Sequence, residues 1–241
     1  MPDADFPELL LEALRTLHAG GAATRSDGPA PAEVRGFEAL FIGGGGAESA
    51  ALRDAVLKAP WPVVFSEECR FVGEKGGFHL LAMHDRPGLV VDLGQTQLKV
   101  AAPGRRWTFQ RDFTRLPMRE DRASESVSEQ RMELRRFIGE SLRECAAGTS
   151  VGGLVIALPS RLDDGGVPEG SSYVGMAGDA ALVEDALEIA GLQHATTWLL
   201  NDAELASLSA RLHPGVDPRK RTLVLTLGFG LGAALLLPCG P

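Results

Sequence analysis

The chain has 241 residues, of which 23% are charged and 44% are hydrophobic, and its formal net charge is −8. This length suits two lobes at about 100–200 residues per domain. The negative charge argues against a nucleic-acid partner, because nucleic acids attract basic surfaces. No apolar run in the sequence reaches the roughly 20 residues of a membrane helix, and Asp3 and Asp5 stand where a secretory signal carries basic residues. We therefore expect a cytoplasmic protein with no membrane or nucleic-acid partner, and we leave a homodimer open.

Helices and short strands alternate at the start of the chain. Apolar residues recur at helical spacing after Asp5, and Gly20 offers an end for that helix. The segment 20–35 is rich in Gly, Ala, Pro and Ser and predicts a loop. The expected elements are a helix over 7–19, a strand over 37–42, a helix over 47–58, a strand over 63–65 and a helix within 71–83.

From residue 88 onward, three strands precede an alternation of helices and strands. We expect an antiparallel meander, a long helix, and then strands that end in polar or glycine residues. Asp179 is the expected N-cap of the helix over 180–190. The strands are expected over 89–92, 97–102, 107–111, 154–158, 196–200, 222–226 and 233–237, and the helices over 128–147, 180–190 and 203–212. This is an α/β pattern, in which ligands bind at the carboxyl ends of strands.

The sharpest candidate site is the segment 90–100, which reads Val-Val-Asp-Leu-Gly-Gln-Thr-Gln-Leu-Lys-Val. Asp92 ends an apolar strand, and Gly94 and Thr96 occupy the turn that follows. Backbone amides and the Thr96 hydroxyl can face a phosphate there. Asp92 can hold a hydrated Mg²⁺, which binds few carboxylates and keeps its waters, and Lys99 adds a charge partner. A plain β-hairpin with a polar turn is the alternative.

This segment resembles the first phosphate motif, D-x-G-x-T, of hexokinases and of ROK-type sugar kinases (repressor, open reading frame, kinase). These enzymes belong to the actin, Hsp70 and hexokinase (ASKHA) superfamily. The strand that ends at Pro159 and Ser160 looks like the family's strand that ends in Pro-Gly, and Asn201 and Asp202 look like its Asn-Asp-Ala segment. The resemblance implies that Asp202 is the catalytic base toward a sugar hydroxyl. It also implies that the acceptor is bound by Pro159, Ser160, Asn201 and Asp202.

Two glycine-rich segments extend the resemblance in a rotated order. Gly228, Gly230 and Gly232 look like the second phosphate motif, G-T-G-x-G, with Phe229 in place of Thr. In the family the adenosine motif follows later in the chain, whereas here the similar residues stand near the start. They are Gly43, Gly44, Gly45 and Gly46 after a strand, and then Gly73, Lys75 and Gly76. The resemblance therefore implies a circular permutation joined within 84–88, which exposed termini and loops tolerate.

The fold implied by this resemblance is the two-lobed, ribonuclease H-like ATPase fold of actin and hexokinase. One lobe is expected over 88–215, with the first phosphate motif and the catalytic Asp. The other is expected over 1–87 plus 216–241, with the second phosphate motif and the adenosine motif. The implied activity is ATP-dependent, Mg²⁺-dependent phosphotransfer to a hydroxyl of a small metabolite. Sugars and sugar derivatives of carbohydrate metabolism are the leading acceptor class.

Two other functions stay open. Phe229 and the segment 170–175, which stands where sugar kinases carry an Asn and a Trp near the sugar, favour a non-catalytic ATP-binding regulator or scaffold. A cofactor-type kinase, such as one acting on pantothenate, shares the Asp-x-Gly-x-Thr start. A fold does not determine a function, so ATP turnover with and without candidate acceptors is needed to separate the three.

Plainer interpretations stand beside the candidate sites. Asn201 and Asp202 are also typical of a helix N-cap, and the four glycines over 43–46 are also typical of a loose turn. The arginines within 105–122 predict a solvated face, with an acidic ligand or partner as the alternative. The five histidines show no ligand spacing, so we expect no metal role for them.

Overall fold

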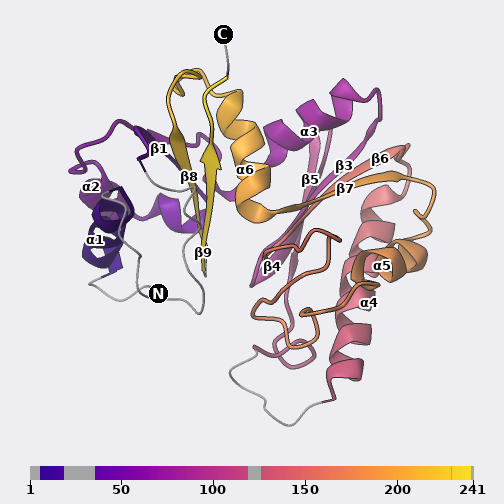
Figure 1. The fold of residues 1–241 in the computed structure, drawn as a ribbon. Coiled ribbons are helices and arrows are strands. Elements are labelled where there is room, and N and C mark those ends of the chain that lie inside the picture. Colours follow the sequence, from indigo (N-terminus) through magenta and orange to yellow (C-terminus); the bar gives the residue numbers. More distant parts are fainter. Residues whose placement is uncertain (1–5, 19–35, 119–125, 229, 240–241) are drawn as a thin grey trace. The chain divides into compact units, whose positions relative to one another are not determined.

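Two compact units make up the part of the chain that the structure describes (Figure 1). The computed structural model describes residues 6–18, 36–118, 126–228 and 230–239. Unit 1 comprises Met1–Val72 and Ala206–Pro241, and unit 2 comprises Gly73–Leu205. Unit 2 begins and ends earlier in the chain than the lobe expected over 88–215. Each unit combines helices with a mixed sheet, which confirms the α/β class.

A five-stranded sheet forms the middle of unit 2. Its strands are β3 (Gly88–Leu93), β4 (Gln97–Ala102), β5 (Arg105–Gln110), β6 (Gly153–Leu158) and β7 (Thr196–Asn201). They are ordered β5-β4-β3-β6-β7. The first three pair antiparallel, which confirms the expected meander, whereas β3, β6 and β7 run parallel. The carboxyl ends of these three parallel strands therefore meet at one edge of the sheet.

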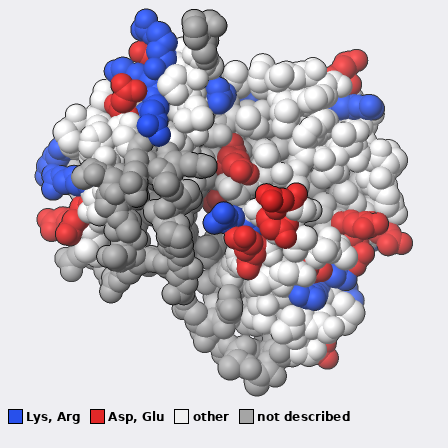
Figure 2. All heavy atoms as spheres, viewed as in Figure 1, with Lys and Arg blue, Asp and Glu red and all other residues white. Residues whose placement is uncertain are grey.

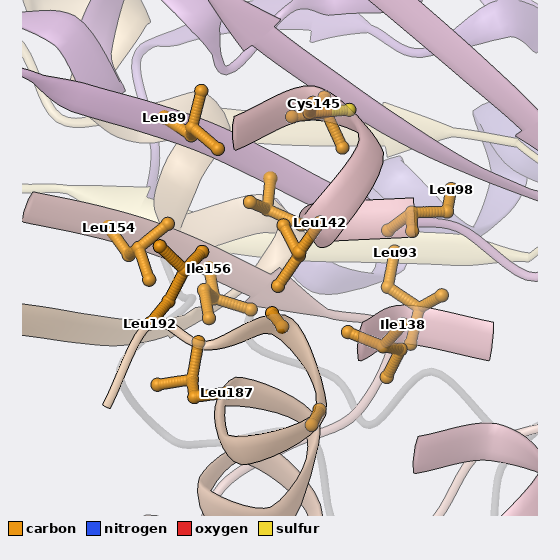
Figure 3. Close-up of a cluster of buried hydrophobic side chains, with 14 of the residues drawn as sticks. Leu89, Leu93, Leu98, Ile138, Leu142, Cys145, Leu154, Ile156, Leu187 and Leu192 are labelled. Carbon is orange, nitrogen blue, oxygen red and sulfur yellow. The ribbon is translucent and has the colours of Figure 1, made fainter. Parts of the chain in front are cut away.

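Helices cover both faces of this sheet: α3 (Glu74–Met83), α4 (Val127–Ala146) and α5 (Leu182–Ala190). On one face, aliphatic side chains of the sheet such as Leu93 pack against α4 and α5 in the main core of the unit (Figure 3). On the opposite face lies α3, where a Cβ added at Gly77 would stand 2.6 Å from the side chain of Val90. Because side chains alternate along a strand, Asp92 shares the α3 face with Val90.

Unit 1 is built on a four-stranded sheet. Its elements are α1 (Phe6–His18), β1 (Ala39–Gly43), η2 (Gly45–Glu48), α2 (Ala50–Val56), β2 (Val63–Phe65), η3 (Cys69–Phe71), α6 (Asp202–Arg211, which begins in unit 2), β8 (Thr222–Leu227) and β9 (Leu231–Leu236). The strand order is β2-β1-β8-β9, and only the β8–β9 pair is antiparallel. Leu40 and Ile42 of β1 pack with α1 and α2, whereas Phe41 packs with α6. Asp5 and Gly20, the expected ends of the first helix, lie outside the described residues.

Two local expectations are wrong. The helix expected over 47–58 is broken at Ser49, whose extended backbone separates η2 from α2 and whose hydroxyl accepts a hydrogen bond from the first turn of α2. Asp179 does not cap α5, because Ala181 occupies the N-cap position. Asp179 is instead buried in an ion pair with Arg135 of α4. A long-range charge partner thus determines the role of this carboxylate.

Four strands are arranged alike in the two units. In unit 2 the hairpin β3–β4 lies beside the parallel strands β6 and β7, in the order β4-β3-β6-β7. In unit 1 the hairpin β8–β9 lies beside the parallel strands β1 and β2, in the order β9-β8-β1-β2. Along the chain, the hairpin comes first in unit 2 and last in unit 1. The turn 94–96 and the turn around Gly228 and Gly230 are therefore equivalent in this arrangement.

On the face drawn in Figure 2, the basic side chains of the described residues are interspersed with acidic ones. Among the described residues, no helix combines the length and the apolar character needed to cross a membrane.

Candidate functional site

The carboxyl ends of β3, β6 and β7 bring the residues of the expected catalytic site to one edge of unit 2. In the register of the sheet, Asp92 of β3 lies opposite Ala157 of β6, and Leu158 of β6 lies opposite Asn201 of β7. Neighbouring strands are about 4.8 Å apart, so β3 and β7 are about 10 Å apart on either side of β6. We call this edge the carboxyl edge of unit 2. Its residues are Asp92, Pro159, Ser160, Asn201 and Asp202. The sheet thus gathers segments that are more than 100 residues apart in the chain.

Asp92 and Lys99 form an ion pair on this edge. The two residues are register partners on β3 and β4, and Lys99 Nζ donates to Asp92 Oδ2 at 2.8 Å. Their side chains are 22% and 12% exposed. No described residue donates a hydrogen bond to Asp92 Oδ1, so this oxygen can still bind a cation.

The donor set fits magnesium better than a transition metal. Among the described residues, no group of three or more His, Cys, Asp or Glu side chains could hold a metal ion. Magnesium, however, needs only one or two protein carboxylates, because substrate phosphates and waters complete its octahedron. Asp92 meets this requirement as a single carboxylate, and Thr96 lies in the turn that follows it.

All three carbonyl groups of the turn 94–96, which follows Asp92, accept hydrogen bonds from other residues of unit 2. Tyr173 Oη donates to Gly94 O at 2.8 Å, Arg111 Nη1 donates to Gln95 O at 2.8 Å, and the Arg111 N–H donates to Thr96 O at 2.9 Å. By contrast, the N–H groups of Gln95 and Thr96 donate to no acceptor among the described residues. Successive unpaired N–H groups in a turn form a concavity that binds anions.

Arg111 contradicts the expectation of a solvated face for the arginines within 105–122. It is 3% exposed, and its guanidinium stacks on the ring of Tyr173 at 3.7 Å. Burial lowers the pKa of Arg111, and burial also raises the pKa of Tyr173, so this phenol stays protonated and can donate. Sequence reasoning missed both residues, although Tyr173 is the one tyrosine of the chain. Arg119 and Arg122, part of the same expectation, lie outside the described residues.

Asn201 is the N-cap of α6, as the plainer interpretation predicts. Its Oδ1 accepts from the Glu204 N–H at 2.7 Å, and its own N–H donates to Glu204 Oε2 at 2.8 Å. This reciprocal pair is a capping box. Asp202 is therefore the first residue of the helix, and its Oδ1 accepts from the Ala203 N–H at 2.8 Å. The partial positive charge of a helix N-terminus stabilises a carboxylate at this position.

Ser160 is held by the loop that follows β6. Its hydroxyl donates to Arg161 O at 2.8 Å and accepts from the Gly170 N–H at 3.1 Å, and the residue is 7% exposed. Gly166, in a turn of this loop, has a φ of +77°. Within the described residues, Ser160 thus closes the loop 160–170, whereas the resemblance implies that it binds the acceptor.

In unit 1, the second phosphate motif and part of the adenosine motif lie at one sheet edge. Gly43 of β1 is the register partner of Thr226 of β8, so the glycines over 43–46 and the turn at Gly228 follow neighbouring parallel strands. The Gly228 N–H donates to Gly230 O at 3.0 Å, and Gly232 belongs to β9. Phe229, the residue that departs from the family pattern, lies outside the described residues.

The rest of the expected adenosine motif belongs to unit 2. Gly73 is the N-cap of α3, and Lys75 and Gly76 lie in the first turn of that helix. A Cβ at Gly73 would stand 2.3 Å from the side chain of Leu205, so the glycine allows the start of α3 to approach the start of α6. The division into units therefore separates Gly73, Lys75 and Gly76 from the glycines over 43–46.

Replacing Gly44 with alanine is expected to destabilise unit 1. Gly44 has φ 87° and ψ 159°, a region that only glycine adopts readily, and a Cβ there would stand 2.3 Å from Leu227 O. We expect Gly44→Ala to cost about 2 kcal/mol or more in the free energy of unfolding, measured by urea denaturation. Gly45→Ala is the matched control, because a Cβ at Gly45 would meet nothing within 4 Å. Equal stability of the two variants would contradict the close approach of this loop to β8.

No model of a known protein family matches the chain, and a search of curated proteins finds no match.

Proposed function

We propose that this protein is an ATP-dependent phosphotransferase that acts on a hydroxyl of a small metabolite, with a sugar or sugar derivative as the leading acceptor class. The main support is the carboxyl edge of unit 2. There, a turn with unpaired N–H groups adjoins the carboxylate of Asp92, and Asp202 follows a parallel strand of the same sheet. Protein kinases use a similar combination, in which a loop covers the phosphates, a carboxylate holds magnesium and a second carboxylate accepts the proton of the acceptor hydroxyl. The cytoplasm supplies both ATP and magnesium, so this activity would be cytoplasmic.

The repeated strand arrangement supports a circularly permuted ASKHA fold. Unit 2 has the meander followed by alternating helix and strand that the resemblance implies. Unit 1 has the same hairpin beside two parallel strands, with the hairpin last in the chain. A permutation that joined the old ends and opened the chain after the second hairpin would produce this order.

In this proposal, each residue of the carboxyl edge has a separate task. The N–H groups of Gln95 and Thr96 would bind phosphate oxygens, because neither group donates to an acceptor among the described residues. Asp92 would hold magnesium through its carboxylate, and a magnesium ion bound there would neutralise negative charge on the phosphates. Asp202 would accept the proton of the acceptor hydroxyl as that oxygen bonds to the terminal phosphorus, while the bond from this phosphorus to the bridging oxygen breaks and ADP leaves.

A non-catalytic ATP-binding module is the second candidate. The hydrogen bonds of Asn201 and Ser160 favour it, because two of the residues that the resemblance assigns to the acceptor are engaged within the protein. Neither Pro159 nor Asp202 is excluded from acceptor binding by these contacts. The two candidates share the phosphate turn and differ in whether an acceptor is phosphorylated.

Calorimetric titration with ATP, with and without magnesium, is the first test. We expect binding that is stronger with magnesium, followed by ADP formation that increases when the right sugar is added. Magnesium-dependent binding without acceptor-stimulated ADP formation across a panel of sugars and polyols would favour the non-catalytic module. An absence of binding at millimolar ATP would refute both candidates.

A further inference from the structure

We propose that Arg111 and Tyr173 are positioning residues that shape the turn 94–96 into a cradle for a phosphoanhydride, such as the polyphosphate of a nucleotide. The inference rests on the proposed function in one respect, that phosphates bind at this turn. It adds that two side chains preorganise the turn before phosphates bind. Neither residue contacts the ligand in this arrangement, because both bind the carbonyl groups of the turn on the side that faces the protein.

The peptide planes of the turn are oriented by the bonds to their carbonyl groups. In a trans peptide, the C=O of one residue and the N–H of the next point in opposite directions within one plane. Tyr173 holds the carbonyl of Gly94 inward at 2.8 Å, so the N–H of Gln95 points away from the protein. Arg111 holds the carbonyl of Gln95 inward at 2.8 Å, so the N–H of Thr96 also points away. The two donors that would bind phosphate are thus aimed by two side chains beneath them.

Every nitrogen of the Arg111 guanidinium donates hydrogen bonds within unit 2. Nε donates to Leu116 O at 2.6 Å, and Nη1 donates to Gln95 O and to Ser172 Oγ. Nη2 donates to Pro117 O and to Ser172 O. These bonds tie the turn to the loop after β5 and to the segment that contains Tyr173. A lysine ammonium has three donors and no planar fork, so it cannot replace this set.

Arg111 also places a positive charge beneath the turn. All of its hydrogen-bond acceptors are neutral oxygens, and the residue is 3% exposed. The charged groups nearest to this assembly on β3 and β4, Asp92 and Lys99, are paired with each other. A buried charge interacts more strongly with an ion than an exposed one, because the surroundings screen it less. An anion on the outer side of the turn would therefore be attracted to Arg111.

Inorganic pyrophosphate is a suitable probe, because it carries the phosphoanhydride without the nucleoside or the acceptor. The full chain would be labelled with ¹⁵N, and the amide shifts of Gln95 and Thr96 would be followed as pyrophosphate is added without magnesium. Arg111→Lys is expected to weaken binding about tenfold or more, and Tyr173→Phe about fivefold, as typical losses of hydrogen bonds near a charge. Tyr173→Phe keeps the ring under Arg111 and removes one hydroxyl, so it decides the question if Arg111→Lys does not fold.

Arg131→Lys is the matched control. Arg131 donates to Gly175 O at 3.1 Å and Ala177 O at 2.9 Å, so it also anchors the segment after Tyr173 but makes no contact with the turn. We expect this variant to lose stability in thermal denaturation without any change in pyrophosphate affinity. If Arg111 and Tyr173 only stabilised the fold, all three variants would lose stability and keep the pyrophosphate affinity of the wild type.

The outcomes separate this inference from the proposed function. The inference is supported if pyrophosphate binds at Gln95 and Thr96 in the wild type and binds more weakly in folded Arg111→Lys or Tyr173→Phe. If this result is found but no acceptor is phosphorylated, only the kinase proposal fails. Unchanged affinity in both folded variants overturns the inference while leaving the kinase proposal intact. Unmoved Gln95 and Thr96 amides in the wild-type titration overturn it as well.

Discussion

Replacing Asp202 with asparagine is expected to lower phosphotransfer by about 100- to 10,000-fold, the usual contribution of a positioned general base. Asp202 is the first residue of α6 at the carboxyl edge of unit 2, where a carboxylate can accept the proton of the attacking hydroxyl. Asparagine keeps the size of the side chain and can still accept the Ala203 N–H, but it cannot take a proton. ATP binding should change little, because the proposed phosphate contacts come from the turn 94–96. Steady-state ADP formation with a productive acceptor, together with an ATP titration, measures both quantities.

Glu204→Gln is the control for this variant. Glu204 carries the other carboxylate in the first turn of α6 and forms the capping box with Asn201. Glutamine preserves a capping box, so this variant removes a negative charge at the same helix end without disturbing the fold. We expect it to retain most of the activity. Full activity in Asp202→Asn, or equal losses in the two variants, would remove Asp202 as the base.

Asp92→Asn is expected to abolish most of the magnesium dependence of ATP binding. Loss of a partner that only orients a metal ligand typically costs 10- to 100-fold in metal affinity, so loss of the ligand itself should cost about 100-fold or more. Affinity for ATP without magnesium should be unchanged or slightly higher, because the variant removes negative charge beside the phosphates. Calorimetry with and without magnesium gives the two affinities, and their ratio is the relevant quantity.

Lys99→Met separates the metal from the ion pair. Asp92→Asn also breaks the 2.8 Å bond to Lys99, so a lower affinity could arise from the loss of that pair. Lys99→Met breaks the same pair but keeps the carboxylate, and we expect it to weaken ATP binding equally with and without magnesium. If the magnesium effect disappears in Lys99→Met and persists in Asp92→Asn, then Asp92 is not the metal ligand.

The sequence alone determined most of the secondary structure and the residues of the first hairpin. Periodicity, turn glycines and strand-ending polar residues are local properties, so the meander, the long helix α4 and the helix–strand alternation were all predictable. The same holds for Asp92, Gly94, Thr96 and Lys99, because a hairpin brings them together within a few residues. Even the competing N-cap interpretation of Asn201 follows from a local pattern, with Glu204 three residues later.

Only the tertiary structure decided which distant residues bind the carbonyl groups of the turn in that hairpin. The sequence predicted Arg111 to be one of several solvated arginines, whereas it is buried and donates to Ser172, 61 residues later in the chain. Tyr173 reaches the carbonyl of Gly94 across 79 residues. Asp179, expected at a helix cap, is bound instead by Arg135 from another helix. Burial and pairing of polar groups depend on which distant segments the sheet brings together, and no local pattern contains that information.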